Sequence, residues 1–324
     1  MLPRILLLVL LVPFLILKSA KTGVSFPRGA APTPESATFH TEVDEVQVTF
    51  TAEDASHRIL EDVTAGDISV LDDGHPARAI TSFRQSFDLP LRLVLAVDRS
   101  DSMQRGFSAQ QHAAAMFLKH LIRPGTDSVL LVDFASQAVF AQPPADRPDL
   151  IFANLQTRDA GTLTALYDAL FAAILRLNQP DDQHPRRAIV LLSDGEDNLS
   201  MHSLPEVFEA ASRADIAIYS ITAHTRRGQH PGDAVLQQLA EATGGQAFVL
   251  SSYTESAVVL AQIEKQLRTE YTVAFRPTGG GCGFHRISIV HHSPHVHIRA
   301  RDRYYECRST THPLWQSSPA PPVN

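Results

Sequence analysis

The chain has 324 residues, of which 44% are hydrophobic and 19% are charged. This composition is typical of a globular protein, and the length leaves room for two domains. Its 28 Lys and Arg residues against 35 Asp and Glu residues give a formal net charge of −7, which argues against a protein that grips the phosphate backbone of nucleic acid. We therefore expect no nucleic-acid partner.

The N-terminal segment has the pattern of an export signal. Residues 5–17 are apolar apart from one proline, with Arg4 before them and Lys18 after them. The run is short for a membrane span, yet Lys18 suits a cleavage site after Ala20 poorly, so residues 1–20 are either a signal peptide or a retained N-terminal anchor. We expect an exported chain that is periplasmic, secreted or anchored to the membrane by this segment.

Short alternating runs follow a linker. Residues 21–36 are rich in Pro, Gly, Ala, Ser and Thr, which predicts the linker. Residues 37–88 then alternate apolar and polar side chains, as in 46–50 and 68–71, with the turn signal Asp72-Asp73-Gly74 after the second run. This pattern predicts the first part of a β-rich module.

The pattern changes over residues 89–269, where buried strands alternate with amphipathic helices. The alternation predicts an α/β fold, a Rossmann-like doubly wound, mostly parallel sheet with helices on both faces. The expected strands are 91–97, 128–134, 188–193, 216–221 and 246–250. Apolar residues recur at helical spacing over 114–122, 163–177 and about 254–268.

Strand patterns return after residue 269 and are too many for one edge of the α/β sheet. We therefore expect residues 270–307 to pair with residues 37–88, so that the α/β domain is inserted in a β-sandwich-like module made from both ends of the chain. The tail, residues 308–324, is predicted to be disordered. The expected strands of this second part are 271–275, 286–290 and 296–300.

Polar side chains that suit a metal ion follow two of the predicted parallel strands. The first strand ends in Asp98-Arg99-Ser100-Asp101-Ser102, a D-x-S-x-S pattern, and another ends at Asp194, while Thr164 opens a predicted helix. Loops at the carboxyl edge of such a sheet gather ligands, and a hard cation such as Mg²⁺ prefers oxygen donors. A D-x-S-x-S pattern alone is weak, because such residues also cap helices and form turns. Together the segments predict a metal site built from Asp98, Ser100, Ser102, Thr164 and Asp194.

Taken in chain order, the segments at Asp98, Thr164 and Asp194 resemble the metal-ion-dependent adhesion site of von Willebrand factor A domains. The sequence from about residue 40 to 305 resembles the exported acidobacterial-type VWFA-related family. The resemblance includes residues 66–74 before the domain and 268–271 after it. Catalytic motifs such as G-x-S-x-G, a Walker loop and H-E-x-x-H are missing from the sequence. The resemblance implies a binding protein, and the missing motifs argue against an enzyme.

The resemblance also implies a role for each site residue. Ser100 and Ser102 would be direct hydroxyl ligands, while Asp98 and Asp194 would act directly or through water. Thr164 would supply the hydroxyl of the third loop, although Gly161-Thr162-Leu163-Thr164 allows a second register in which Thr162 does so. Asp101 stands where the family usually has glycine.

The donor set suggests how the site would work. With only two carboxylates among its ligands, the ion stays electrophilic and accepts one more oxygen. We expect Mg²⁺, with Mn²⁺ or Ca²⁺ as alternatives, and a protein partner that presents an Asp or Glu carboxylate. Contact with a membrane is expected only through the N-terminal segment. The alternatives are a metal-assisted hydrolase and a structural module whose metal only stabilises the fold.

Two smaller groups of residues each have two interpretations. Cys282 and Cys307 flank an expected β-hairpin and either pair in an oxidising compartment or remain thiols. A cluster of histidines could form a transition-metal site. Solvated strand and turn residues are the favoured interpretation, because no cysteine or carboxylate lies at a clear ligand spacing from them. Those histidines are His285, His291, His292, His295 and His297.

Overall fold

The computed structural model describes residues 45–87, 89–140, 144–147, 161–181, 183, 185–223, 230–250, 252, 255–278 and 282–307. All of them belong to a compact unit that begins at Val43. The expected signal or anchor, linker and C-terminal tail lie outside these residues. Among the described helices, none is long and apolar enough to cross a membrane.

The centre of the α/β domain is a six-stranded sheet in the order β10-β9-β8-β5-β6-β7. Neighbouring strands run parallel, except that β7 is antiparallel to β6. The predicted α/β fold is thus confirmed, and only the short edge strand β7 lacks a sequence signal. The strands are β5 (Leu91–Asp98), β6 (Ser128–Phe134), β7 (Ala138–Phe140), β8 (Arg186–Leu192), β9 (Ala217–Ala223) and β10 (Ala247–Leu250).

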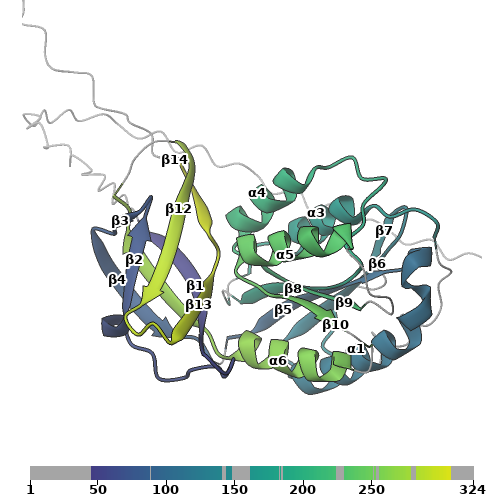
Figure 1. The fold of residues 1–324 in the computed structure, drawn as a ribbon, viewed down its shortest axis with the longest axis horizontal. Coiled ribbons are helices and arrows are strands. Elements are labelled where there is room, and N and C mark those ends of the chain that lie inside the picture. Colours follow the sequence, from purple (N-terminus) through teal and green to yellow (C-terminus); the bar gives the residue numbers. More distant parts are fainter. Residues whose placement is uncertain are drawn as a thin grey trace, which may run out of the picture. The chain divides into compact units, whose positions relative to one another are not determined.

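Helices cover both faces of this sheet (Figure 1). Leu93 and Leu95 of β5 pack in the core with α1 and α6, whereas Val94 and Ala96 pack in the core with α3, α4 and α5. Because both faces of β5 are buried, its sequence is a continuous apolar run. The helices are α1 (Phe107–Leu121), α3 (Leu166–Leu177), α4 (Leu204–Ala214), α5 (Pro231–Thr243) and α6 (Ser256–Arg268), and the short 3₁₀ helix η2 (Asp101–Gly106) precedes α1.

The remaining strands form two antiparallel four-stranded sheets, in the orders β13-β1-β11-β4 and β14-β12-β2-β3. Strands from before and after the α/β segment pair directly, since β1 lies between β11 and β13, and β2 pairs with β12. Their inner faces share one apolar core that includes Phe50, Val70, Tyr271 and Ile287. We call these two sheets the β-sandwich module. Its strands are β1 (Val46–Asp54), β2 (Ile68–Asp72), β3 (His75–Pro76), β4 (Ala79–Gln85), β11 (Tyr271–Arg276), β12 (Cys282–His291), β13 (Val296–Ala300) and β14 (Arg303–Cys307).

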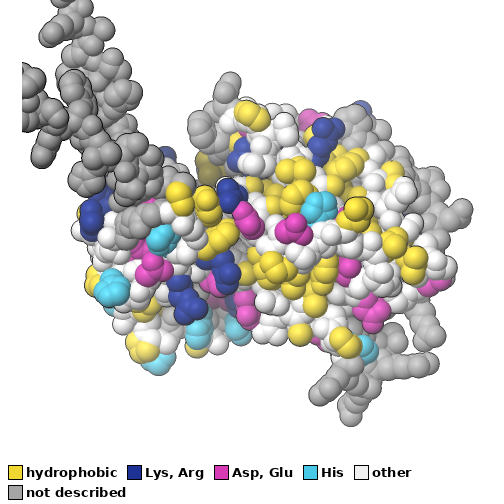
Figure 2. All heavy atoms as spheres, turned by 90° about the horizontal axis from the view of Figure 1, so that it is seen from above, with side chains coloured by type: hydrophobic (Ala, Val, Ile, Leu, Met, Phe, Trp, Pro, Cys, Tyr) yellow, Lys and Arg dark blue, Asp and Glu magenta, His cyan; other side chains and the backbone are white. Residues whose placement is uncertain are grey.

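Surface character differs between the two parts. Viewed from the side of α3, α4 and α5, basic and histidine side chains are frequent over the β-sandwich module, while hydrophobic ones are scattered over the α/β domain (Figure 2). The exposed apolar residues of the α/β domain include Leu175, Leu199 and Met201. Scattered exposed residues of this kind are common on soluble proteins.

The edge strand β14 is joined covalently to the module. Cys282 is disulfide-bonded, and Cys307, the other cysteine of the sequence, stands opposite it in the β12–β14 register. We expect Cys282→Ser to lower the free energy of unfolding by about 3 kcal/mol, because the bond closes a loop that restricts the unfolded chain. Urea denaturation of the oxidised proteins measures this difference. A reductant should lower the midpoint of the wild type and leave the variant unchanged, and equal midpoints without reductant would contradict the prediction.

Candidate metal centre

Three of the predicted site residues meet in the loop that follows β5. Asp98 is fully buried, and its carboxylate accepts hydrogen bonds from the Ser193 hydroxyl at 2.7 Å and from the Ser100 backbone N–H at 2.9 Å. The Ser100 and Ser102 hydroxyl oxygens lie 3.0 Å apart. Asp98, Ser100 and Ser102 therefore place their oxygens together at the carboxyl edge of the parallel sheet.

Asp194 follows β8, the strand next to β5, and so lies at the same edge. Burial raises the pKa of Asp98 to about 6; hydrogen bonds from Ser193 and Ser100 oppose this shift, and the charge of Asp194 adds to it. Among the described residues, no Lys or Arg forms an ion pair with Asp98. A buried carboxylate beside a second carboxylate is stabilised by a nearby cation, so the donor set fits a divalent metal.

The loop that contains Thr164 runs beside the D-x-S-x-S loop. Gly161 pairs with Ser100 through a parallel bridge, and its carbonyl accepts the Asp101 N–H at 3.0 Å. Thr164 is buried while Thr162 is exposed. The structure thus brings the Thr164 loop beside the Asp98 loop through the backbone of Gly161.

The start of α3 differs from the prediction. Thr164 was expected to open the helix, but α3 begins at Leu166 with Ala165 as its N-cap, which leaves Thr164 in the preceding loop. The carboxylate of Asp197, from the loop after β8, accepts the Leu166 N–H at 2.8 Å. Asn198 accepts the Thr164 N–H at 2.8 Å and donates its own N–H to the Thr164 carbonyl at 3.0 Å. The loop after β8 therefore fixes both Thr164 and the first turn of α3.

Ser193 is a site residue that the sequence reasoning missed. Its hydroxyl donates to Asp98 and accepts the Gly195 N–H at 3.1 Å, so it links the ends of β5 and β8. The available signal was a hydroxyl residue between a buried strand and Asp194. Asp101, the departure from the family pattern, is exposed at the start of η2.

Close packing of α5 against the loop after β8 positions Asp194. A Cβ added at Gly232 would collide with the Asp194 carbonyl oxygen. We expect Gly232→Ala to cost about 1–3 kcal/mol of stability and to weaken metal binding, because the Asp194 loop must shift. Thermal unfolding with and without MgCl₂ measures both effects. Gly66→Ala is the matched control, since the nearest atom to its Cβ would be 3.7 Å away; equal behaviour of the two variants would contradict the prediction.

A separate group of potential ligands lies in the β-sandwich module. Asp72, Asp73 and His285 place ligand atoms within 4.8 Å of one another. The Asp72 carboxylate already accepts the Tyr304 hydroxyl at 2.8 Å and the Thr278 N–H at 2.6 Å, and Asp73 bonds the His285 ring at 2.8 Å. These bonds join β2, β12 and β14, which accounts for the group without a metal.

The other histidines of the predicted cluster belong to no such group among the described residues. His292 lies 3.0 Å from the Ser69 hydroxyl, and His291 accepts the Ser293 N–H at 2.9 Å. The exposed positions His292, His295 and His297 fit the favoured interpretation of strand and turn residues.

Comparison with known proteins identifies a domain in part of the chain. Residues 93–196 match the family model described as the von Willebrand factor type A domain, a span that includes all five predicted ligands. No match was found among curated proteins.

Solved structures show more distant likeness. The conserved hypothetical protein BatB from Bacteroides thetaiotaomicron is 17% identical, with a TM-score of 0.45, over 54% of this chain and 98% of its own. Proximal thread matrix protein 1 from the mussel byssus, in a structure with a zinc-occupied MIDAS motif, is 16% identical with a TM-score of 0.49, over 60% of this chain and 50% of its own, so this chain spans about half of that protein. A von Willebrand factor type A structure from Catenulispora acidiphila is 12% identical with a TM-score of 0.48, over 82% and 75%. Residues 93–196 thus match a von Willebrand factor type A domain, and this segment includes the D-x-S-x-S loop at the carboxyl end of β5.

Proposed function

We propose that this chain is an extracytoplasmic protein that binds a partner protein through a divalent metal held by its von Willebrand factor type A domain. The observation that carries the proposal is the meeting of Asp98, Ser100 and Ser102 in one loop, with Asp194 at the same sheet edge. Hydroxyl and carboxylate oxygens are the donors that hard cations prefer.

Each residue has a distinct part in this proposal. Ser100 and Ser102 bind the metal through their hydroxyls, and Asp98 and Asp194 bind it directly or through water. Thr164 contributes the hydroxyl of the third loop. A bound Mg²⁺, or Mn²⁺ or Ca²⁺ in its place, would supply positive charge and a coordination position for an outside carboxylate. Ser193 holds the Asp98 side chain by its 2.7 Å hydrogen bond and so orients it.

The partner presents an Asp or Glu carboxylate to this site. With two neutral hydroxyls and two carboxylates as ligands, the ion can accept another anionic ligand. Binding is favoured over hydrolysis because no general base is identified in the sequence. An exported location agrees with the N-terminal sequence and with the disulfide at Cys282, since disulfides persist in oxidising compartments.

Capture experiments test the proposal. Wild type, Ser100→Ala/Ser102→Ala and the control Ser288→Ala, an exposed hydroxyl on β12, are immobilised and exposed to native envelope and medium fractions, in Mg²⁺ and in chelator. We expect one protein to be captured by wild type and control in Mg²⁺ and lost in the double variant and in chelator. Capture of the same proteins under every condition would overturn the proposal. A chelator-dependent melting temperature without metal-dependent capture would favour the structural alternative instead.

A further inference from the structure

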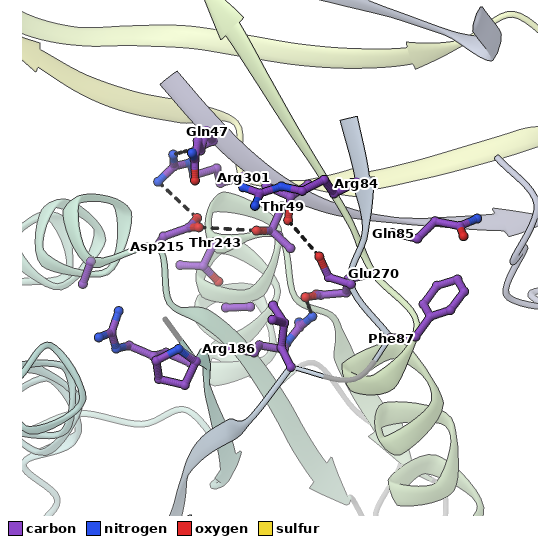
Figure 3. Close-up of a pocket in the computed structure, with 18 of the residues that line it drawn as sticks. Gln47, Thr49, Arg84, Gln85, Phe87, Arg186, Asp215, Thr243, Glu270 and Arg301 are labelled. Carbon is purple, nitrogen blue, oxygen red and sulfur yellow. Dashed lines mark hydrogen bonds and ion pairs between the residues drawn. The ribbon is translucent and has the colours of Figure 1, made fainter. Parts of the chain in front are cut away.

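A cavity of about 1030 Å³ lies at the edge of the parallel sheet opposite to the metal centre (Figure 3). The loops of Asp98 and Asp194 follow the carboxyl ends of β5 and β8, whereas this cavity is lined by the first residues of β8 and β9 and by strands β1, β4 and β11 of the β-sandwich module. Most of its lining side chains are polar or charged. Its volume is at the upper end of the roughly 300–1,000 Å³ range of small-molecule sites.

The acidic residues of the cavity wall are each bound by an arginine. Arg186 and Glu270, which Figure 3 shows pointing toward each other, form an ion pair whose side chains are only 8% and 6% exposed. The other two pairs are Asp215 with Arg301 at 3.2 Å and Asp181 with Arg92 at 3.0 Å. The negative charge on the wall is therefore already balanced by these partners.

Two further arginines of the wall form no ion pair with a described residue. Arg84 comes from β4 in the β-sandwich module, and Arg187 comes from β8 in the α/β domain. The only hydrogen bond of the Arg187 guanidinium between described residues goes to the neutral Gln179 carbonyl at 3.0 Å. Arg187 helps to lower the pKa of Asp181, although the Gln183 backbone contributes most and Arg92 more than Arg187. Four arginines and three acidic residues line the cavity, so its lining has an excess of positive charge, and Arg84 and Arg187 lie on different walls.

The C-terminal ends of two helices, α4 and α5, lie at the cavity. The last turn of α4 ends at Asp215 and that of α5 at Gly244, and helix C-termini have partial negative charge. Arg301 donates to the Ser212 carbonyl of α4 at 2.7 Å and so neutralises one of these ends. A guanidinium binds carboxylate and phosphate oxygens with paired, charge-assisted hydrogen bonds.

We propose that this cavity binds a small molecule with two oxyanion groups, carboxylates or phosphates, one beside Arg84 and the other beside Arg187. The two arginines come from different walls, so a ligand with charge at both ends uses both. A neutral ligand would offer neither guanidinium group a charge-assisted hydrogen bond. Binding here requires neither the metal nor the residues of the metal centre, and the proposal stands apart from the function given above.

Calorimetric titration of the metal-free chain with glutarate and with pyrophosphate tests this. We expect one of the two to bind with 1:1 stoichiometry, which also tells carboxylate from phosphate recognition. Arg84→Gln and Arg187→Gln should each weaken that binding about tenfold or more, because each removes a charged hydrogen-bond donor. Thermal unfolding without ligand verifies that both variants are folded.

Two controls make the test specific. Arg58→Gln removes an exposed arginine that pairs with Asp54 and does not line the cavity, and Asp98→Ala removes a carboxylate at the opposite edge of the sheet. Both should bind the probe like the wild type. The proposal is overturned if neither probe binds, if the cavity variants bind as tightly as the wild type, or if Arg58→Gln loses as much affinity as they do.

Discussion

Replacement of Asp98 by alanine is expected to abolish the rise in melting temperature that Mg²⁺ gives the wild-type protein. At a free Mg²⁺ concentration of 100 times the dissociation constant, binding to the folded state alone adds about 2.7 kcal/mol of stability. Asp98→Asn should have the same effect while keeping the side-chain volume in its buried position. Thermal unfolding of each variant with and without MgCl₂ measures the loss.

The threonine loop supplies a matched comparison for this result. Thr164 is buried beside the site and Thr162 is exposed, so Thr164→Ala should reduce the Mg²⁺-dependent rise and Thr162→Ala should leave it unchanged. The reverse outcome would assign the metal-loop hydroxyl to Thr162. A rise of wild-type size in Asp98→Ala would refute the metal site itself.

Asp127→Asn should cost about 3–5 kcal/mol of stability, because it breaks a buried ion pair and leaves a charge without its partner. The Asp127 side chain is 0% exposed and accepts hydrogen bonds from the backbone N–H groups of Leu91 and Arg123, each at 2.8 Å. It also pairs with the Arg268 guanidinium. One carboxylate therefore joins the start of β5, the segment after α1 and the end of α6.

The same carboxylate gives a pH dependence of defined sign. Burial alone would raise the pKa of Asp127, but hydrogen bonds from Arg268, Arg123 and Leu91 outweigh it and lower the pKa to about 2. Because the pKa in the folded state lies below the ordinary value of 3.8, the stabilisation is present above pH 3.8 and is lost as the pH falls through about 2. This lost contribution is about 2 kcal/mol.

Urea denaturation at several pH values tests both statements. The difference in unfolding free energy between wild type and Asp127→Asn should be largest near neutral pH and shrink toward pH 2. Glu209→Gln, a carboxylate that is 46% exposed and paired with Arg213, is the control and should change the stability little. A difference that stays constant with pH would show that Asp127 does not act through its charge.

The sequence predicted those features that depend on neighbouring residues. Strands β5, β6 and β8 are continuous apolar runs, and Asp98, Ser100 and Ser102 lie in one loop whose spacing alone brings their oxygens together. Helices α4 and α5 were not identified individually, although Ser203 and Glu206 form a capping box at the start of α4 and Pro231 begins α5.

Features that depend on distant contacts were less accessible. The sequence placed Leu163 in the apolar stripe of α3, yet its side chain is 43% exposed and the helix begins three residues later. That boundary is set by Asp197, which caps α3 from a loop thirty-odd residues away. The role of Ser193 likewise depends on the pairing of β8 with β5, which no local pattern reports.

The pairing of β1 with β11 and β13 fixes an order of assembly during synthesis. About 220 residues separate Phe50 from Tyr271, its partner in the register. At a ribosomal rate of about 5–20 residues per second, β1 is therefore synthesised on the order of 10–40 s before that partner. The intervening α/β segment contains all the strands of its own sheet and can fold within this interval. We therefore expect the inserted domain to form first on the nascent chain, and its folding then shortens the loop across which the sandwich closes.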